Sequence, residues 1–242
     1  MPFALVFPVM IILTNHTGAT HMITGSLLSI LLLGFVLGIK HAIEPDHVIA
    51  VSTIVSESKN IKRSLFAGVY WGIGHTATLF IVGMFLLVAK NTINDTVAMN
   101  LEFLVGIMLV TLGFNSLLSL ITHRHHHTYT PAEHNRKTRS NVKSFFIGLV
   151  HGLAGSAAMV LLTMSTVSTA WQGALYILIF GAGTVAGMLS FSTVIGLPFV
   201  LTSGKQVNRY LNNITGIISI LFGLYYMYNL GVNEGLFFIW FS

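Results

Sequence analysis

Side chains that bind metals are concentrated in one short segment of an otherwise apolar stretch. His41, Glu44, Asp46 and His47 occupy four positions of a seven-residue segment. Imidazole and carboxylate together suit borderline divalent ions such as Ni(II), Co(II), Zn(II) or Fe(II). We expect His41, Asp46 and His47 to be metal ligands. Glu44 is an additional candidate. The alternative is an internally paired polar cluster, in which Lys40 pairs with Glu44 and His41 bonds Asp46.

Pro45 determines how this segment can fold. On an uninterrupted helix Asp46 would point nearly opposite to His41 and His47. Proline removes the amide that would bond the carbonyl of His41, and it disfavours helical backbone at Glu44. We therefore expect the helix to kink or unwind at this point, so that His41, Asp46 and His47 converge.

Other histidines lie in apolar stretches or in a polar linker. His75 lies among small residues, and His151 is followed by a small, hydroxyl-rich run that includes Ser156. We expect His75 to be a ligand and His151 and Ser156 to be additional candidates, although either histidine could instead bond across helices as a packing residue. Histidine-rich tracts bind metals without geometric selectivity, so a metal-collecting role is expected for the linker; a merely polar connection is the alternative. The linker histidines are His123, His125, His126, His127 and His134.

The elements that must position these residues are membrane helices. Only 8% of the 242 residues are charged and the mean hydropathy is +0.80, whereas a soluble domain is normally about a quarter charged. Each apolar stretch is long enough for a transmembrane helix and lacks the alternation of a β-barrel. The six predicted spans are 27–55, 65–89, 101–121, 145–168, 174–201 and 210–230. Ionisable groups at membrane depth cost roughly 3 kcal/mol or more, so the charged cluster in the first span requires a partner such as a cation or water.

The basic residues predict the orientation of these spans. Ten of the 12 Lys and Arg residues lie in three connections, 59–63, 124–143 and 205–209. By the positive-inside rule these connections face the cytoplasm, and they alternate as a six-span chain requires. The net charge of +5 therefore reports topology, and no nucleic-acid partner is expected. The chain has no cysteine, which excludes thiolate metal ligands and thiol redox chemistry.

The two halves of the chain align after a shift of 110 residues. Three spans per repeat is an odd number, so the second copy must be inverted in the membrane. Inverted repeats are a recurring transporter construction with the substrate site at the repeat interface; chance matching among glycine-rich segments is the alternative. The aligned pairs are Gly38 with Gly148, His41 with His151, Gly106 with Gly216, Gly113 with Gly223 and, after a one-residue slip, His75 with Thr184.

The predicted fold is an all-α polytopic membrane protein of six core helices, arranged as two inverted three-helix repeats. The apolar residues 3–14 could add a seventh helix, an interfacial or re-entrant segment, or a signal peptide. The expected parts are an N-terminal hydrophobic segment and outer loop (1–25), the first repeat (26–121), a His-rich basic cytoplasmic linker (122–143), the second repeat (144–232) and a C-terminal tail (233–242).

The motif His41-Ala-Ile-Glu-Pro-Asp46-His47 resembles the signature of the nickel/cobalt transporter family, which is His, four residues, then Asp-His. It looks most like the branch related to the urease accessory protein UreH, where Glu-Pro occupies the middle of the motif. Gly74-His75-Thr76 is similar to the family's second element, and residues 151–156 to a later motif of the branch. The resemblance implies that His41, Asp46, His47 and His75 are metal-site residues. The acidic motif Gly-Phe-Asp-Thr-Ala-Thr-Glu of other members is absent here.

Site chemistry and resemblance together predict a carrier of divalent transition metals in the bacterial plasma membrane, with nickel favoured over cobalt. It is expected not to be an enzyme and to hold no resident cofactor. The resemblance implies a functional link to the maturation of urease or another nickel enzyme, and a homo-oligomer is an open expectation. Members include importers and exporters, and the His-rich loop resembles that of exporters. The alternatives are a carrier of a non-metal substrate, an intramembrane zinc hydrolase and a b-haem protein.

Overall fold

The computed structural model describes residues 27–56, 60–90, 93–122, 141–155, 163, 167, 169–201 and 205–241. All regular elements in this part of the chain are helices. The N-terminal segment 1–25, residue Ser156 and the linker histidines His123, His125, His126, His127 and His134 lie outside the described residues. Expectations about them stay predictions.

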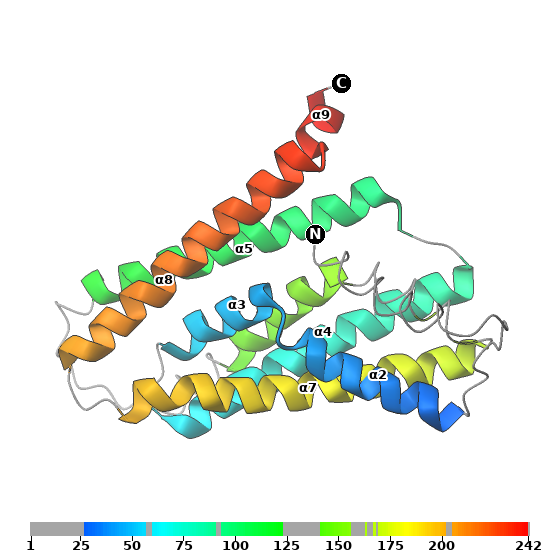
Figure 1. The fold of residues 1–242 in the computed structure, drawn as a ribbon, viewed down its shortest axis with the longest axis horizontal. Helices are drawn as coiled ribbons and strands as arrows, with labels where there is room; N and C mark the ends of the chain where they lie inside the picture. The colour runs from blue at the N-terminus through cyan, green and yellow to red at the C-terminus, as the bar shows by residue number, and fades with distance from the viewer. Residues whose placement is uncertain are drawn as a thin grey trace, which may run out of the picture.

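The first predicted span is two helices. α2 (Leu27–His41) and α3 (Pro45–Ser56) are bent by 56° at a short break. The amide of Glu44 donates to the carbonyl of His41 over 3.1 Å, which closes the last turn of α2. Pro45 then opens α3 at the first helical position, where a missing amide is harmless. The break that Pro45 predicts is therefore confirmed (Figure 1).

The remaining helices form a multi-pass bundle. Four of them are long and apolar enough to cross a membrane, and the bent pair α2–α3 raises the number to as many as five among the described residues. Large apolar side chains face outward, as a lipid environment requires; Phe85 is 71% exposed and Trp171 is 72% exposed. The helices after α3 are α4 (Ile61–Ala89), α5 (Asp95–Thr122), the helical residues 141–155 (helix 141–155), α7 (Ala170–Leu201), α8 (Lys205–Tyr228), the π-helical η2 (Asn229–Asn233) and α9 (Leu236–Phe241).

Two helices begin earlier than their apolar stretches. The side chain of Asn60 accepts from the amide of Lys62 over 2.9 Å, and that of Asn94 accepts from the amide of Thr96 over 2.9 Å. Asparagine caps of this kind satisfy free amides at a helix start. The caps therefore extend α4 and α5 into the polar residues before the apolar stretches, which the predicted spans 65–89 and 101–121 do not include. The predicted C-terminal tail 233–242 contains the short helix α9.

Glycines let the helices around the site pack backbone to backbone. α2 and α4 both pack against α7. A Cβ atom at Gly38 of α2 would overlap the carbonyl oxygen of Phe180, and one at Gly183 of α7 would overlap that of Phe35. Glycine at such positions allows the closest approach of two membrane helices. These contacts therefore hold α2 against α7 close to the end of α2 at His41.

Helix 141–155 is held against α4 in the same way. A Cβ atom at Gly74 would overlap the carbonyl oxygen of Phe145, and one at Gly148 would overlap that of Trp71. The hydroxyl of Thr78 donates to the carbonyl of Leu149 over 3.0 Å. These contacts fix the register between the two helices that carry His75 and His151.

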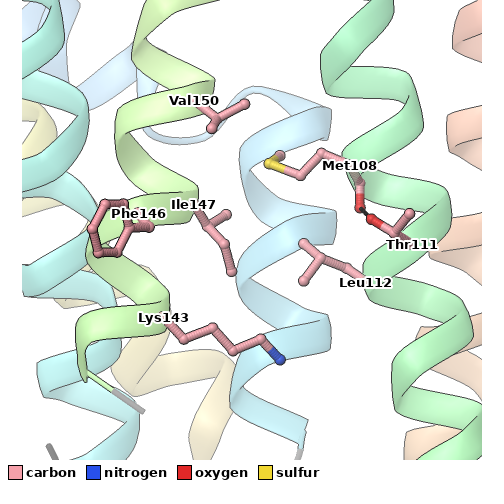
Figure 2. Close-up of a pocket in the computed structure, with 7 residues that line it drawn as sticks. All are labelled: Met108, Thr111, Leu112, Lys143, Phe146, Ile147 and Val150. Carbon is pink, nitrogen blue, oxygen red and sulfur yellow. Dashed lines mark hydrogen bonds between the residues drawn. The ribbon is translucent and has the colours of Figure 1, made fainter. Parts of the chain in front are cut away.

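α5 and α8 form a separate pair. The hydroxyl of Ser219 donates to the carbonyl of Leu109 over 2.7 Å, and glycines from both helices meet on either side of this bond. The pair contacts the other labelled helices mainly through α3 (Figure 1). An apolar groove of about 260 Å³ opens between α5 and helix 141–155, with Lys143 at one end (Figure 2). None of the predicted site residues lines this groove.

Most of the basic residues in the described part of the chain lie at one end of the bundle, with Lys40 and Lys90 as the exceptions. Lys62 and Arg63 lie at the start of α4, Lys143 at the start of helix 141–155, and Arg209 in the first turns of α8. These starts lie at the left of Figure 1, together with the ends of α5 and α7. This end is called the basic end below.

Candidate metal-binding site

The break between α2 and α3 brings the signature residues to the centre of the bundle. His41 is the last residue of α2, and Asp46 and His47 lie in the first turn of α3. His75 lies near the middle of α4, and His151 lies in helix 141–155. The side chains of His47 and His75 are 1% exposed, and that of His151 is 3% exposed. Five predicted residues from three parts of the sequence thus meet in one place, where the three histidines His47, His75 and His151 are buried and His41 and Asp46 are partly buried.

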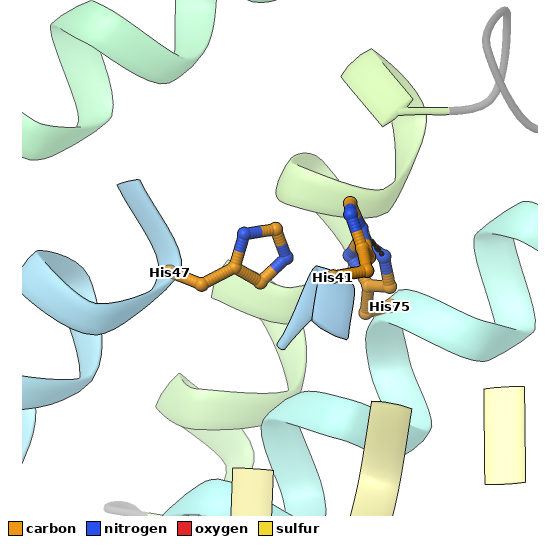
Figure 3. A group of neighbouring side chains, drawn as sticks. All are labelled: His41, His47 and His75. Atoms are coloured by element: carbon orange, nitrogen blue, oxygen red, sulfur yellow. Dashed lines mark hydrogen bonds between the residues drawn. The ribbon is translucent and has the colours of Figure 1, made fainter. Parts of the chain in front are cut away.

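The first group of potential ligands is His41, His47 and His75. One ring nitrogen from each lies within 4.8 Å of the others. Nε2 of His41 and Nε2 of His75 are 3.1 Å apart. Figure 3 shows the ring of His47 approaching this pair from α3. An imidazole nitrogen binds a first-row metal at about 2.0–2.1 Å, so two ligands at right angles are separated by about 3 Å. The spacing of His41 and His75 fits such an ion.

Glu44 supports His41 from the side away from this group. Its Oε2 lies 2.9 Å from Nδ1 of His41. A carboxylate on one ring nitrogen fixes the tautomer and leaves the other nitrogen free to bind a metal. Glu44 is therefore paired with His41, and Lys40 is exposed. The alternative pairing of Lys40 with Glu44 was wrong, because the turn at residues 42–44 directs the carboxylate toward the imidazole of His41.

The second group is Asp46, His47 and His151. Oδ1 of Asp46 lies 3.2 Å from Nδ1 of His47, and Oδ2 lies 2.9 Å from Nε2 of His151. One ligand atom from each residue lies within 4.8 Å of the others. Asp46 thus bonds these histidines, and the alternative bond to His41 was wrong. The signature residues form two adjacent groups that share His47, instead of the single point that the sequence predicts.

Three buried nitrogens in this cluster have no hydrogen-bond partner among the described residues. They are Nε2 of His47, Nδ1 of His75 and Nδ1 of His151. A buried polar atom left without a partner costs about 1–3 kcal/mol. A bound water or a bound ion can satisfy such atoms, and together with the clustered imidazoles they make this place a candidate binding site for a cation.

Two aromatic residues that the sequence prediction missed pack against the histidines. The indole of Trp71 stacks on His47 with ring centroids 5.6 Å apart, and the ring of Phe180 lies 5.4 Å from His41. Trp71 lies four positions before His75, and Phe180 lies four positions before Thr184, the residue that the repeat alignment pairs with His75. The repeat alignment was therefore the signal that could have identified them.

The sequence prediction also missed a third carboxylate within the predicted spans, in addition to Glu44 and Asp46. Oε2 of Glu102 in α5 accepts from the hydroxyl of Tyr226 in α8 over 3.1 Å. This contact lies in the α5–α8 pair and belongs to neither histidine group.

A comparison with protein families defines the class of the chain. The family model described as "Cytochrome C biogenesis protein transmembrane region" matches residues 29–225. This range includes both histidine groups and all of the predicted spans except the first residues of span 27–55 and the last residues of span 210–230. The apolar helices and this match show a multi-pass membrane protein. No solved structure gives a significant match.

Comparison with curated proteins identifies the branch. The chain is 61% identical to the urease accessory protein UreH of Bacillus sp. strain TB-90, over 88% of this chain and 97% of the relative. It is 27% identical to a protein of Methanocaldococcus jannaschii named as a nickel/cobalt efflux system, over 79% of this chain and 88% of that protein. The chain therefore belongs to the family that the model describes and to the UreH-like branch of the nickel/cobalt transporter family.

A more distant relative comes from plants. The chloroplast protein FOR GROWTH AND FERTILITY 1 of Arabidopsis thaliana is 25% identical over 79% of this chain, but the match spans only 56% of that protein. The names of the two prokaryotic relatives describe an accessory protein and an efflux system, neither of which is an enzyme.

Proposed function

We propose that the protein carries divalent transition-metal ions across the membrane, with Ni(II) as the preferred cargo, through the histidines and carboxylate at the break between α2 and α3. The observation that carries this proposal is the first histidine group. Nε2 of His41 and of His75 face each other at 3.1 Å, and a third buried nitrogen, Nε2 of His47, has no partner among the described residues.

The donor set favours a borderline metal. Imidazole nitrogens predominate and a single carboxylate, Asp46, completes the second group. Imidazole suits Ni, Cu, Zn and Fe, whereas Mg and Ca prefer oxygen ligands. The chain has no cysteine and so offers no thiolate. The relatives named as a urease accessory protein and as a nickel/cobalt efflux system favour Ni(II) or Co(II) within this set.

The proposed carrier has six core spans in two inverted repeats, residues 26–121 and 144–232, joined by the linker 122–143. Contacts that occur in equivalent pairs support this organisation. When a two-fold axis relates two repeats, a contact of residue i in the first repeat with residue j in the second occurs again between the residues equivalent to i and j. In the α5–α8 pair Gly106 meets Gly223, and the aligned positions Gly216 and Gly113 meet each other. The bond between Ser219 and Leu109 joins two residues that the 110-residue shift makes equivalent.

The contacts around the site support the same symmetry. Gly74 packs against the backbone of helix 141–155, and Gly183 packs in the same manner against α2. α2 and helix 141–155 run in opposite directions in Figure 1, as do α4 and α7. The contacts that the alignment relates are Gly74 with Phe145 and Leu149, and Gly183 with Phe35 and Ile39.

The proposed transport cycle uses both histidine groups. The ion binds at one group and passes to the other through the shared ligand His47. Rocking of the two repeats about the site then exposes it to the opposite face. The urease relative supports delivery of the metal to a nickel enzyme, whereas the efflux relative supports removal of the metal from the cell. The direction of flux decides between these roles.

The test is nickel flux in proteoliposomes. Variants His41→Ala and His47→Ala should lose radiolabelled nickel flux. Ser52→Ala, which removes a hydroxyl bonded within α3, should keep it. Unchanged flux in both histidine variants would refute the proposal. Zinc that stays bound at one ion per chain through purification, together with hydrolysis of a peptide or amide, would favour the intramembrane hydrolase instead.

A further inference from the structure

We propose that Trp71 and Phe180 are the two gates of the ion path, with Trp71 on the cytoplasmic side of the histidine cluster and Phe180 on the outer side. This inference rests on the proposed function, because it takes the cluster to be the binding site of the transported ion. It adds two residues that control access and do not coordinate the ion.

Trp71 covers the second histidine group. Its indole is nearly parallel to the ring of His47, with an interplanar angle of 16° and centroids 5.6 Å apart. The ring of His151 lies 5.4 Å away. The side chain is 1% exposed. An ion bound between His47 and His151 therefore has the indole as its immediate neighbour on this side.

Phe180 covers the first histidine group. Its ring lies 5.4 Å from that of His41, and the side chain is 6% exposed. The backbone of the same residue is in contact with Gly38 of α2. This contact fixes the backbone of Phe180 beside the end of α2 that carries His41.

The two aromatic residues lie on opposite sides of the cluster along the membrane normal. α4 starts at the basic end, and Trp71 precedes His75 by four residues, which places it about 6 Å nearer to that end. α7 runs in the opposite direction (Figure 1). Gly181 of α7 contacts Thr76 of α4, so the preceding residue Phe180 lies beyond His75, on the side away from the basic end. The positive-inside rule makes the basic end cytoplasmic.

Each aromatic residue belongs to its own apolar cluster. Trp71 packs in a cluster that contains Val51, Val55 and Phe199 and that extends to Val105 of α5. Phe180 packs in a different cluster with Leu79, Tyr176 and Ile177. Apolar constrictions exclude water and hydrated ions, which is how hydrophobic gates close a pore. Each of the two aromatic residues is thus part of an apolar closure next to the histidines.

Each closure also contains a buried polar atom without a partner among the described residues. These atoms are Nε1 of Trp71 and the hydroxyl of Tyr176. An unsatisfied buried donor destabilises the closed arrangement. Water that enters on opening can bond these atoms, so opening of either gate recovers hydrogen bonds that the closed state lacks.

The repeat alignment relates the two gates. The shift that places His75 on Thr184 also places Trp71 on Phe180. In an inverted repeat, equivalent residues lie on opposite sides of the central site. Alternating access requires one gate on each side of the binding site, and the alignment places one aromatic residue on each side.

The test uses a single cysteine as a reporter of access. The natural chain has no cysteine, so the introduced thiol is the sole target of a thiol reagent. A Cβ atom at Gly155 would lie 3.8 Å from His75 and 3.9 Å from His41, which are ordinary contact distances. Gly155→Cys therefore places a thiol beside the histidines. The rate of labelling by the membrane-impermeant cation 2-(trimethylammonium)ethyl methanethiosulfonate is measured without metal, in inside-out and in right-side-out vesicles.

Removal of one gate should change access from one face. Trp71→Ala should raise the rate from the cytoplasmic face, and Phe180→Ala should raise it from the outer face. Because a minor open state is populated at about 0.1–10%, permanent opening raises the rate by roughly 10- to 1,000-fold. Trp71→Phe and Phe180→Leu should give smaller rises on the same faces, and they keep the test valid if an alanine variant does not fold.

Matched controls come from lipid-facing residues on the same helices. Phe66 in α4 is 48% exposed and Leu178 in α7 is 46% exposed. Phe66→Ala and Leu178→Ala should leave labelling from both faces unchanged. The gate assignment is overturned if the rates do not change in the gate variants, if they rise from the opposite face, or if they rise equally from both faces.

Nickel measurements separate failure of the gates from failure of the proposed function. Each single gate variant should still bind nickel in calorimetry, because all the imidazoles remain, but should lose accumulation driven by a gradient. The double variant Trp71→Ala/Phe180→Ala should leak nickel passively. If the natural chain binds no nickel, the proposed function fails, while the labelling pattern still decides whether these residues gate the site.

Discussion

Nε2 of His151 lies 2.9 Å from Oδ2 of Asp46, although 105 residues separate them in the chain. This bond joins the start of α3 to helix 141–155. It crosses from the first half of the chain to the second, and both carboxylate oxygens of Asp46 are then occupied by histidines. The position of α3 therefore depends on both halves, so a movement of one against the other changes the geometry of the site.

The shared ligand should matter most for binding. His47→Ala removes an imidazole from both groups, whereas His151→Ala leaves the group of His41, His47 and His75 intact. Changes to groups that only support a ligand typically weaken metal binding 10- to 100-fold, so loss of His47 should weaken nickel binding by more than about 100-fold. The loss in His151→Ala should be smaller. Calorimetry with Ni(II) on purified protein measures both, and equal losses would contradict the two-group arrangement.

Glu44 should act through His41. Its carboxylate fixes the imidazole by a 2.9 Å contact to Nδ1. Glu44→Ala should weaken nickel binding roughly 10- to 100-fold, and Glu44→Gln should weaken it less because an amide oxygen still accepts from that nitrogen. Glu102→Gln is the control, since Glu102 bonds Tyr226 in the α5–α8 pair. A loss in Glu102→Gln as large as in Glu44→Ala would mean that the loss does not report on His41.

The glycine contacts should be intolerant of a methyl group. A Cβ atom at Gly148 would overlap the backbone of Trp71, whereas one at Gly155 meets only imidazole atoms at 3.8 Å or more. Overpacking of this kind typically costs about 1–3 kcal/mol. Gly148→Ala should therefore lower the thermal unfolding midpoint in detergent, and Gly155→Ala should lower it little. Equal midpoints for the two variants would show that helix 141–155 does not touch α4 as described.

Labelling of single-cysteine variants determines which end of the bundle faces the cytoplasm. Lys62 and Lys143 lie at the basic end, and Asp95 lies at the start of α5 at the other end (Figure 1). An impermeant thiol reagent should label Lys62→Cys and Lys143→Cys from the cytoplasmic face and Asp95→Cys from outside. The absence of natural cysteine removes background labelling. Labelling of Lys62→Cys and Lys143→Cys from opposite faces would exclude the proposed inverted arrangement.

The broken helix could be predicted because its cause is local. Pro45 lacks an amide and restricts Glu44, so the break follows from two adjacent residues. The bend of 56° and the capture of His41 by Glu44 depend on tertiary packing. The local sequence predicts neither the angle of the bend nor the contact between Glu44 and His41. The starts of α4 and α5 were placed too late for a different reason, because polar caps lie outside any apolar window.

The division of the ligands into two groups was also beyond the sequence. Asp46 was expected to converge with His41, but it is held by His47 and by His151 from a distant helix. Which histidine a carboxylate bonds depends on the angle between helices that are remote in the chain. The repeat alignment predicted that His151 occupies the position equivalent to His41, but it could not predict that the distance to Asp46 is short enough for a bond.

The glycine-lined contacts have a consequence for how such proteins diverge. Gly38 and Gly183 hold α2 against α7, and Gly74 and Gly148 hold α4 against helix 141–155. The imidazoles and carboxylates take no part in these backbone contacts. If the proposed site selects the ion, an exchange at His75 alters the ligand set while these glycine contacts remain. Metal preference in this architecture can then change during evolution by few substitutions, because the backbone contacts that hold these helix pairs together do not involve the candidate ligands.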